Sequence, residues 1–339
     1  MDLHLLWFLL IAFLFTGFFV LEGFDYGVGI LLPFLGKGDT ERRMIINTIG
    51  PFWDGNEVWL VAAGGALFAA FPNWYATLFS GFYLEMFFIL LALILRGSAF
   101  EFRSKREDPR WRSFWDWMIF VGSMLPGFLW GVIVANLIHG VPIDANMNYV
   151  GTILTPFTPF ALLCGLSLVA LFTLHGAIFI SLRVDGPMMR RAQKAARLIW
   201  LPTLALLLLM VGFGYNLSAV FHRLILDPRI VPLGYATLAA LVAIPWLVMR
   251  GRSGWAFAMT TLVILLVAGT VGLGMYPNVM LSSLNPAWSL TVANASSSPY
   301  SLMVMSWIAL SIVPFVLLYQ AWNYWVFRQR IQPHTIGHY

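Results

Sequence analysis

Long apolar segments separated by short polar ones extend from Leu3 to Phe327. A helix needs about 20 mostly apolar residues to cross a bilayer, and nine segments reach that length. They are Leu3–Phe34, Pro51–Phe71, Trp74–Arg96, Phe114–His139, Phe157–Leu182, Ala192–Leu217, Ile230–Met249, Trp255–Tyr276 and Leu302–Phe327. The pattern predicts an all-α integral membrane protein with about nine transmembrane helices. Pro202 and Pro245 interrupt two spans, which membrane helices tolerate when neighbours satisfy the freed backbone groups.

Lysine and arginine are concentrated in every second loop between these spans. Of the 20 basic residues, 18 follow odd-numbered spans or lie in the C-terminal tail, and only Arg223 and Arg229 fall on the other side. Cytoplasmic loops are enriched in lysine and arginine. The count therefore predicts an N-terminus outside and a C-terminus in the cytoplasm, with Lys105 cytoplasmic and His222 external.

The amino-acid composition supports an integral membrane protein over a soluble one. Hydrophobic residues make up 60% of the 339, charged residues 10%, and mean hydropathy is +0.81, whereas soluble domains average roughly 25% charged residues. This excludes a soluble enzyme. The basic residues are spread over short loops, so nucleic acid is not an expected partner. The first apolar run is longer than a signal peptide and predicts a retained helix.

No linker or low-complexity tract divides the chain, which predicts one membrane domain over residues 1–339. The expected grouping is a first four-helix bundle in 1–139, a second in 157–276, and a ninth, peripheral helix in 302–327. Transmembrane bundles of this kind pack at small crossing angles. The carboxylates within spans all fall in the first bundle.

The chain has few cysteine and histidine side chains that could bind the metal or haem of a redox centre. Cys164 is the only cysteine, which excludes an intrachain disulfide, a CxxC motif and a cysteine-ligated iron–sulfur cluster. His175 alone is deep in a span, and His334 and His338 are in the tail. A lone helical histidine is more often a satisfied core residue than an axial haem ligand. We expect no metal and no cofactor bound directly by this chain.

Four carboxyl groups mark the candidate chemistry. Glu22 and Asp25 are three residues apart, and Asp54 and Glu57 repeat that spacing, so each pair shares a helix face. Both pairs fall toward the cytoplasmic ends of neighbouring spans. Carboxylates that converge in a low dielectric can relay protons. We predict a proton path through them, with Asp54 as the strongest candidate.

Other roles for these groups stay open. The carboxylates could pair with Arg96, Arg42 or Arg43, or cap the second span. Glu85 is expected near mid-membrane, where a protonated carboxyl can serve as a simple hydrogen-bonding group. At the end of a span, an arginine such as Arg96 commonly extends to the headgroups, and Asp116, between two tryptophans, is expected at the interface.

Several segments together identify a family. The runs GFDYGVGILLPFLG, WDGNEVW, LRGSAFEFRSK and RWRSFWDWMIFVGS, with GWAFAMTTL and MYPNVM further on, closely resemble subunit II of cytochrome bd quinol oxidase. The resemblance is dense through Asn136, weakens over the fifth to seventh spans and returns near the C-terminus. WDGNEVW in this context is highly specific.

The resemblance implies a heterodimer in the bacterial cytoplasmic membrane. Its partner, subunit I, carries haems b and d, oxidises quinol and reduces oxygen to water, while subunit II is haem-free. Some members of the family hold a structural quinone in this subunit. The resemblance also allows a small accessory subunit with a single helix as a further partner. Membrane lipid surrounds the complex, and quinol reaches it through subunit I.

The resemblance also carries roles to particular residues. Carboxylates at the EGFD and WDGN positions form a cytoplasmic proton route in the family, so Glu22, Asp25, Trp53 and Asp54 inherit candidate roles. Arg96 matches an arginine that supports that route or the haem propionates. Many relatives have histidine where this chain has Phe52, which removes a titratable neighbour.

Two other functions fit the membrane pattern. Intramembrane acids and interrupted helices also occur in proton-coupled secondary transporters, although no inverted halves are visible and the acids are confined to one half. A purely structural partner of a redox subunit is the other alternative, with carboxylates that only hold helices together.

Overall fold

The computed structural model describes residues 2–217 and 219–332 and is all-helical apart from one small strand pair. Within these residues, eight helices are long and apolar enough to cross a membrane. They are α1 (Leu3–Leu35), α5 (Tyr83–Phe102), α6 (Pro109–His139), α7 (Pro159–Arg183), α8 (Gly186–Leu217), α10 (Val231–Met249), α11 (Ser253–Met275) and α12 (Pro299–Val326).

Shorter elements fill the connections. They are α2 (Asp39–Ile49), α3 (Trp53–Ala70), α4 (Pro72–Gly81), α9 (Ala219–Leu226), the 3₁₀ turns Arg103–Lys105 and Pro286–Trp288, and β1 (Asn278–Met280) paired antiparallel with β2 (Leu290–Thr291). The acidic first turn of α2, with Asp39 and Glu41, complements the helix dipole.

Three predicted spans differ from the structure in an informative way. The second span corresponds to α3, whose 18 residues begin with Asp54, Asn56 and Glu57, so its composition does not mark it as a membrane helix. The third span is broken at Phe82 into α4 and α5. The sixth begins earlier than predicted, at Gly186, because its basic first turns continue the helix.

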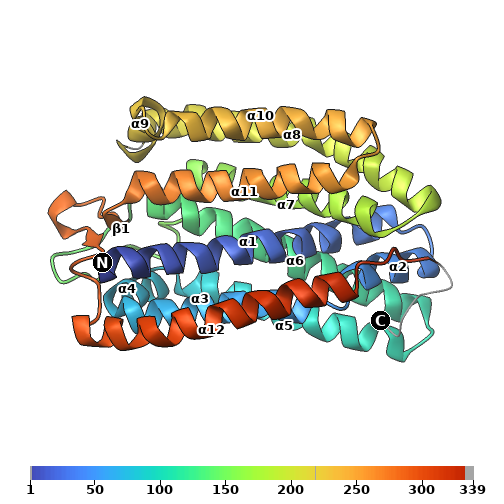
Figure 1. Ribbon diagram of the computed structural model, residues 1–339, viewed down its shortest axis with the longest axis horizontal. Helices are drawn as coiled ribbons and strands as arrows, with labels where there is room; N and C mark the ends of the chain where they lie inside the picture. The colour runs from blue at the N-terminus through green and yellow to red at the C-terminus, as the bar shows by residue number, and fades with distance from the viewer. Residues whose placement is uncertain (1, 218, 333–339) are drawn as a thin grey trace.

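The helices lie side by side along the long axis of the molecule, with α1 in the middle (Figure 1). α1 packs against α3, α6, α7 and α11. α8 and α10 form one outer layer, and α3, α5 and α12 lie on the opposite side (Figure 1). α1 and α7 approach each other closely at Gly27 and Gly176, where a Cβ on Gly27 would lie 2.8 Å from the Gly176 Cα. Only glycine permits such contact.

The basic connections gather at one end of the bundle, which we call the basic end. It carries α2 and the α5–α6, α7–α8 and α10–α11 connections, whereas α9, with Arg223, and the β1–β2 pair lie at the opposite end (Figure 1). α1 begins at that opposite end, and α12 ends at the basic end. The predictions for His334 and His338 lie outside the described residues.

Ion pairs link the elements of the basic end. Asp116 on α6 accepts from Arg42 Nη1 at 2.7 Å and from Arg103 Nε at 2.6 Å. Its side chain is 1% exposed. Two arginines from neighbouring segments therefore neutralise the Asp116 carboxylate inside the protein, and the expected interfacial depth of Asp116 stays a prediction.

Candidate functional site

Glu22 and Asp25 point into the middle of the bundle from α1. Both are fully buried, and their spacing of three places them on one helix face. Asp25 lies ten residues before the end of α1 at Leu35, about 15 Å from the basic end of this helix. The two acids are thus well inside the helical body and on its basic side.

Arg96 brings the acids of two helices together. Its Nη2 donates to Glu22 Oε1 on α1 and to Glu57 Oε1 on α3, and its Cζ lies 4.9 Å from the centroid of the Tyr26 ring. Arg96 is fully buried, so it does not extend to the headgroups. The alternative that these acids pair with Arg96 is confirmed for Glu22 and Glu57.

Asn56 joins the acids to the C-terminal helix. Its Nδ2 donates to Asp25 Oδ2 at 2.7 Å, and its Oδ1 accepts from Gln320 Nε2 at 3.0 Å and from the Tyr324 hydroxyl at 2.9 Å. None of these three residues was predicted as part of the site from the sequence. The available signal for Asn56 was its position between Asp54 and Glu57, two residues already expected at the site.

Asp54 does not face this cluster. Its side chain is exposed, whereas that of Asn56 is fully buried. Residues two apart on a helix differ by about 200° around its axis, so the inward direction of Asn56 turns Asp54 outward. The cluster predicted from four carboxyl groups therefore contains Glu22, Asp25 and Glu57, with Asp54 on the outer face of the same turn.

Aromatic rings enclose the first turn of α3. Trp53 packs against Phe100, with ring centroids 5.1 Å apart, and its ring covers Gly97 one residue after Arg96. Phe52 stacks on Tyr324 at 4.3 Å. The rings keep bulk solvent from Asn56 and Arg96, which strengthens the charge interactions there.

Glu85 lies apart from the cluster. It is buried, at 2% exposure, in the first turn of α5. Eleven residues along one helix separate it from Arg96, or about 16 Å. The structure therefore does not bring Glu85 together with the α1 carboxylates.

His175 is satisfied within the protein. Its Nε2 lies 3.2 Å from Val20 O and its Nδ1 lies 2.6 Å from Thr260 Oγ1. A carbonyl only accepts, so Nε2 donates to Val20. The ring stacks on Phe257 with centroids 4.5 Å apart. Both nitrogens are occupied, which agrees with a core histidine. Across the described residues, no group of three or more His, Cys, Asp or Glu side chains could hold a metal ion.

The charge balance of the cluster indicates its chemistry. Three carboxyl groups share one guanidinium, and a buried site of low dielectric opposes unbalanced charge. The cluster is closest to neutral when some of the carboxyls hold protons. Glu57, whose side chain is 21% exposed, is the most exposed member of the cluster and connects the buried acids to the surface of α3.

Comparison with known proteins gives a consistent result. Residues 3–327 match the family model described as cytochrome bd terminal oxidase subunit II. The chain is 44% identical to cytochrome bd ubiquinol oxidase subunit 2 of Bacillus subtilis (strain 168) over 97% of each chain. It is 39% identical to cytochrome bd-I ubiquinol oxidase subunit 2 of Escherichia coli (strain K12), over 98% of this chain and 96% of that one.

The fold is also similar to that of a solved structure. The bd oxidase from Geobacillus thermodenitrificans contains a chain that aligns with a TM-score of 0.79, at 17% identity, over 96% of this chain and 99% of that one. At this identity the likeness concerns the fold alone.

Proposed function

The chain belongs to the cytochrome bd terminal oxidase subunit II family, and on that premise we propose that it is the haem-free subunit II of a membrane quinol oxidase. Its partner is a haem-bearing subunit I that oxidises quinol and reduces oxygen to water, in the bacterial cytoplasmic membrane. Family membership favours this role over the transporter alternative. The engagement of both His175 nitrogens supports a chain that does not ligate haem.

The second part of the proposal is a proton path from the cytoplasm. The observation that carries it is the buried cluster of Glu22, Asp25, Glu57 and Arg96, which combines more carboxyls than cations. Protons on such carboxyls can be exchanged at little cost in net charge. In this path Glu22 and Asp25 hold the protons. The positive charge of Arg96 stabilises these carboxyls when they are deprotonated, and Glu57 passes protons between them and the exposed surface of α3.

Asp54 gives this path an exit toward the partner. It begins a stripe of exposed residues on α3 that continues with Val58 (54% exposed), Val61 (74%) and Phe68 (60%). An aspartate on a lipid-facing helix surface is unfavourable, and the cost rises toward the bilayer centre. A face of subunit I that covers the stripe removes this cost and brings Asp54 to the haem-bearing protein.

We further propose the membrane topology that the basic residues indicate. α3 serves as a further span beside the eight long helices, which gives nine within the described residues, grouped as residues 1–139, 157–276 and 302–327. The basic end faces the cytoplasm and α1 begins outside. The clustering of basic connections at one end (Figure 1) supports this orientation.

Turnover per haem in the purified complex tests the path. Glu22→Gln and Asp54→Asn retain shape and hydrogen bonding but remove titration. Each is expected to lower oxygen consumption per haem at least 10-fold with the complex still assembled. Glu107→Gln removes an exposed carboxyl and is the matched control. A purely structural role predicts instead that haem content and activity fall together, and near-normal turnover per haem in both variants contradicts the path.

A further inference from the structure

A group of cations at the basic end has no carboxylate partner. Ion pairs neutralise Arg42, Arg103, Arg112, Arg191 and Arg330. By contrast, no ion pair is found in the described residues for the exposed cations at the ends of α8 and α10. These are Arg190, Lys194, Arg197, Arg250 and Arg252. The α5–α6 connection also has free cations, but Glu101, Glu107 and Asp108 accompany them. The surplus charge is therefore concentrated on the outer layer.

Two hydrogen bonds fix the register of α8 against α10. Trp200 Nε1 donates to Leu241 O at 2.8 Å, and Gln193 Nε2 donates to Ser253 Oγ, just after α10, at 3.4 Å. The helices run antiparallel, so Lys194 and Arg197 are level with the last turn of α10. The cations of α8 and α10 therefore lie at the same depth along the bundle.

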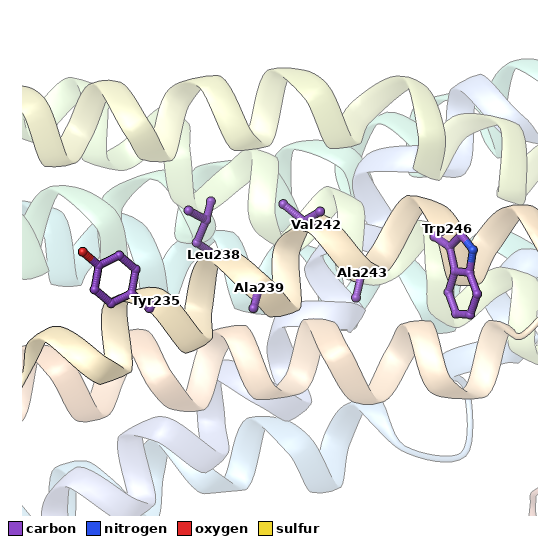
Figure 2. Close-up of a pocket in the computed structure, with 6 residues that line it drawn as sticks. All are labelled: Tyr235, Leu238, Ala239, Val242, Ala243 and Trp246. Atoms are coloured by element: carbon purple, nitrogen blue, oxygen red, sulfur yellow. The ribbon is translucent and has the colours of Figure 1, made fainter.

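A shallow apolar hollow, open to the surroundings and lined by residues of α10 alone, begins at that depth and runs along the helix. Figure 2 shows its lining, in which the small Ala239 and Ala243 lie between the larger Tyr235 and Trp246. The hollow spans 11 residues, or about 16 Å, which is close to half of the ~30 Å hydrocarbon core. This is the reach of one acyl chain in one leaflet.

Arg250 connects the hollow to the cations. Its Cζ lies 5.3 Å from the centroid of the Trp246 ring, so a guanidinium stands at the end of the hollow nearest the basic end. An anionic headgroup there would meet Arg250 and Lys194 while its chain enters the hollow. Tryptophan at such a position commonly marks the headgroup level.

We propose that α8 and α10 bind an anionic phospholipid of the leaflet at the basic end, with its phosphate between Lys194 and Arg250 and one acyl chain in the Tyr235–Trp246 hollow. The occupant is chosen by charge complementarity: no acidic residue lies on α8 or α10, and clusters of basic residues beside membrane helices attract acidic headgroups. This site lies across the bundle from the Asp54 stripe (Figure 1).

Native mass spectrometry of the purified, delipidated complex tests the proposal, with phosphatidylglycerol and phosphatidylcholine added in parallel. We expect phosphatidylglycerol to be retained in preference. The double variant Lys194→Gln/Arg250→Gln should lower its affinity roughly 25-fold, since each surface cation contributes a factor of about five. Lys105→Gln/Arg110→Gln removes the same two residue types from the same end and should leave retention unchanged.

A second pair of variants tests the hollow without changing charge. Ala239→Phe fills the hollow and should weaken phosphatidylglycerol retention several-fold, whereas Ala236→Phe, exposed on the same helix outside the lining, should not. Equal retention of the two lipids, or equal losses in test and control variants, overturns the site. Thermal protection by inorganic phosphate alone, equal to that by phosphatidylglycerol, would overturn the assignment to a lipid.

Discussion

The side-chain amide of Asn56 on α3 donates to the carboxylate of Asp25 on α1 across 2.7 Å. The same amide accepts from Tyr324 and Gln320 of α12. One uncharged residue therefore holds a buried acid and fixes the position of the C-terminal helix against it. A carboxylate in place of this amide could not donate to Asp25, which explains why an amide suits the position.

Asn56→Ala should destabilise the complex by about 1–3 kcal/mol, because the partners of the amide are left unsatisfied in a buried site. The thermal unfolding midpoint of the purified complex measures this loss. Asn73→Ala, which removes an exposed hydrogen bond to Asn294 O at 3.2 Å, is the matched control and should change stability by no more than about 0.5 kcal/mol. Equal effects of the two substitutions contradict the bridging role of Asn56.

Arg96→Gln should impair assembly, since removal of one partner from a buried ion pair costs about 3–5 kcal/mol. The double variant Arg96→Gln/Glu22→Gln removes a carboxylate charge together with the cation and should recover part of the yield. Haem-containing complex per cell is the readout, and Arg110→Gln, an exposed cation, is the control. If the double variant assembles no better than Arg96→Gln, the charge balance proposed for the cluster is wrong.

Glu41 should make stability depend on pH. Burial raises the pKa of Glu41, but hydrogen bonds from Arg191 Nη2 at 2.5 Å and from the Lys37 backbone N–H at 2.8 Å outweigh burial and hold the pKa below its usual value. A carboxyl whose pKa is lower in the folded state stabilises the protein above its unfolded pKa. This contribution is lost as the pH falls through the folded pKa.

Glu41→Gln should accordingly lower the thermal midpoint of the complex above about pH 5, by the equivalent of at most ~1 kcal/mol for a partly exposed pair. The difference from the parent should narrow toward lower pH. Glu107→Gln should show no effect at pH 7. A difference between Glu41→Gln and the parent that grows on acidification would reverse the sign and contradict the role of the Arg191 pair.

Cysteine labelling tests the orientation. Cys164, at 7% exposure, is replaced by serine, and Lys105→Cys or His222→Cys is introduced on that background. In intact cells, a membrane-impermeant maleimide should modify His222→Cys and spare Lys105→Cys until the cells are opened. The reverse pattern would place the basic end outside and remove the proposed cytoplasmic source of protons.

His175 should be dispensable for haem binding. His175→Gln keeps a donor and an acceptor near Val20 and Thr260, so the complex should retain its haem absorption bands, with a stability loss of about 1–3 kcal/mol. The chain expressed without subunit I should show no stoichiometric haem signal. Loss of one haem band in His175→Gln, with the complex assembled, would identify the residue as a ligand.

The membrane class, the apolar segments and the concentration of basic residues in alternate loops could all be predicted from the order of residues along the chain. Span length and charge asymmetry are properties of consecutive residues that a bilayer imposes, so they can be predicted along the chain. The shared face of Glu22 and Asp25 followed in the same way, from helical spacing alone. The family was equally predictable, because its motifs are contiguous.

Which side chains contact one another could not be predicted in this way, because it depends on how the helices pack. The contact between Tyr324 and Asn56 joins residues 268 positions apart, and no periodicity within either helix encodes it. The direction of Asp54 depends on the rotation of α3 about its own axis, which packing against α1 and α12 sets. Arg96 could have extended to the headgroups; it is buried instead because acids from two other helices converge on it, and that convergence exists only once the bundle is assembled.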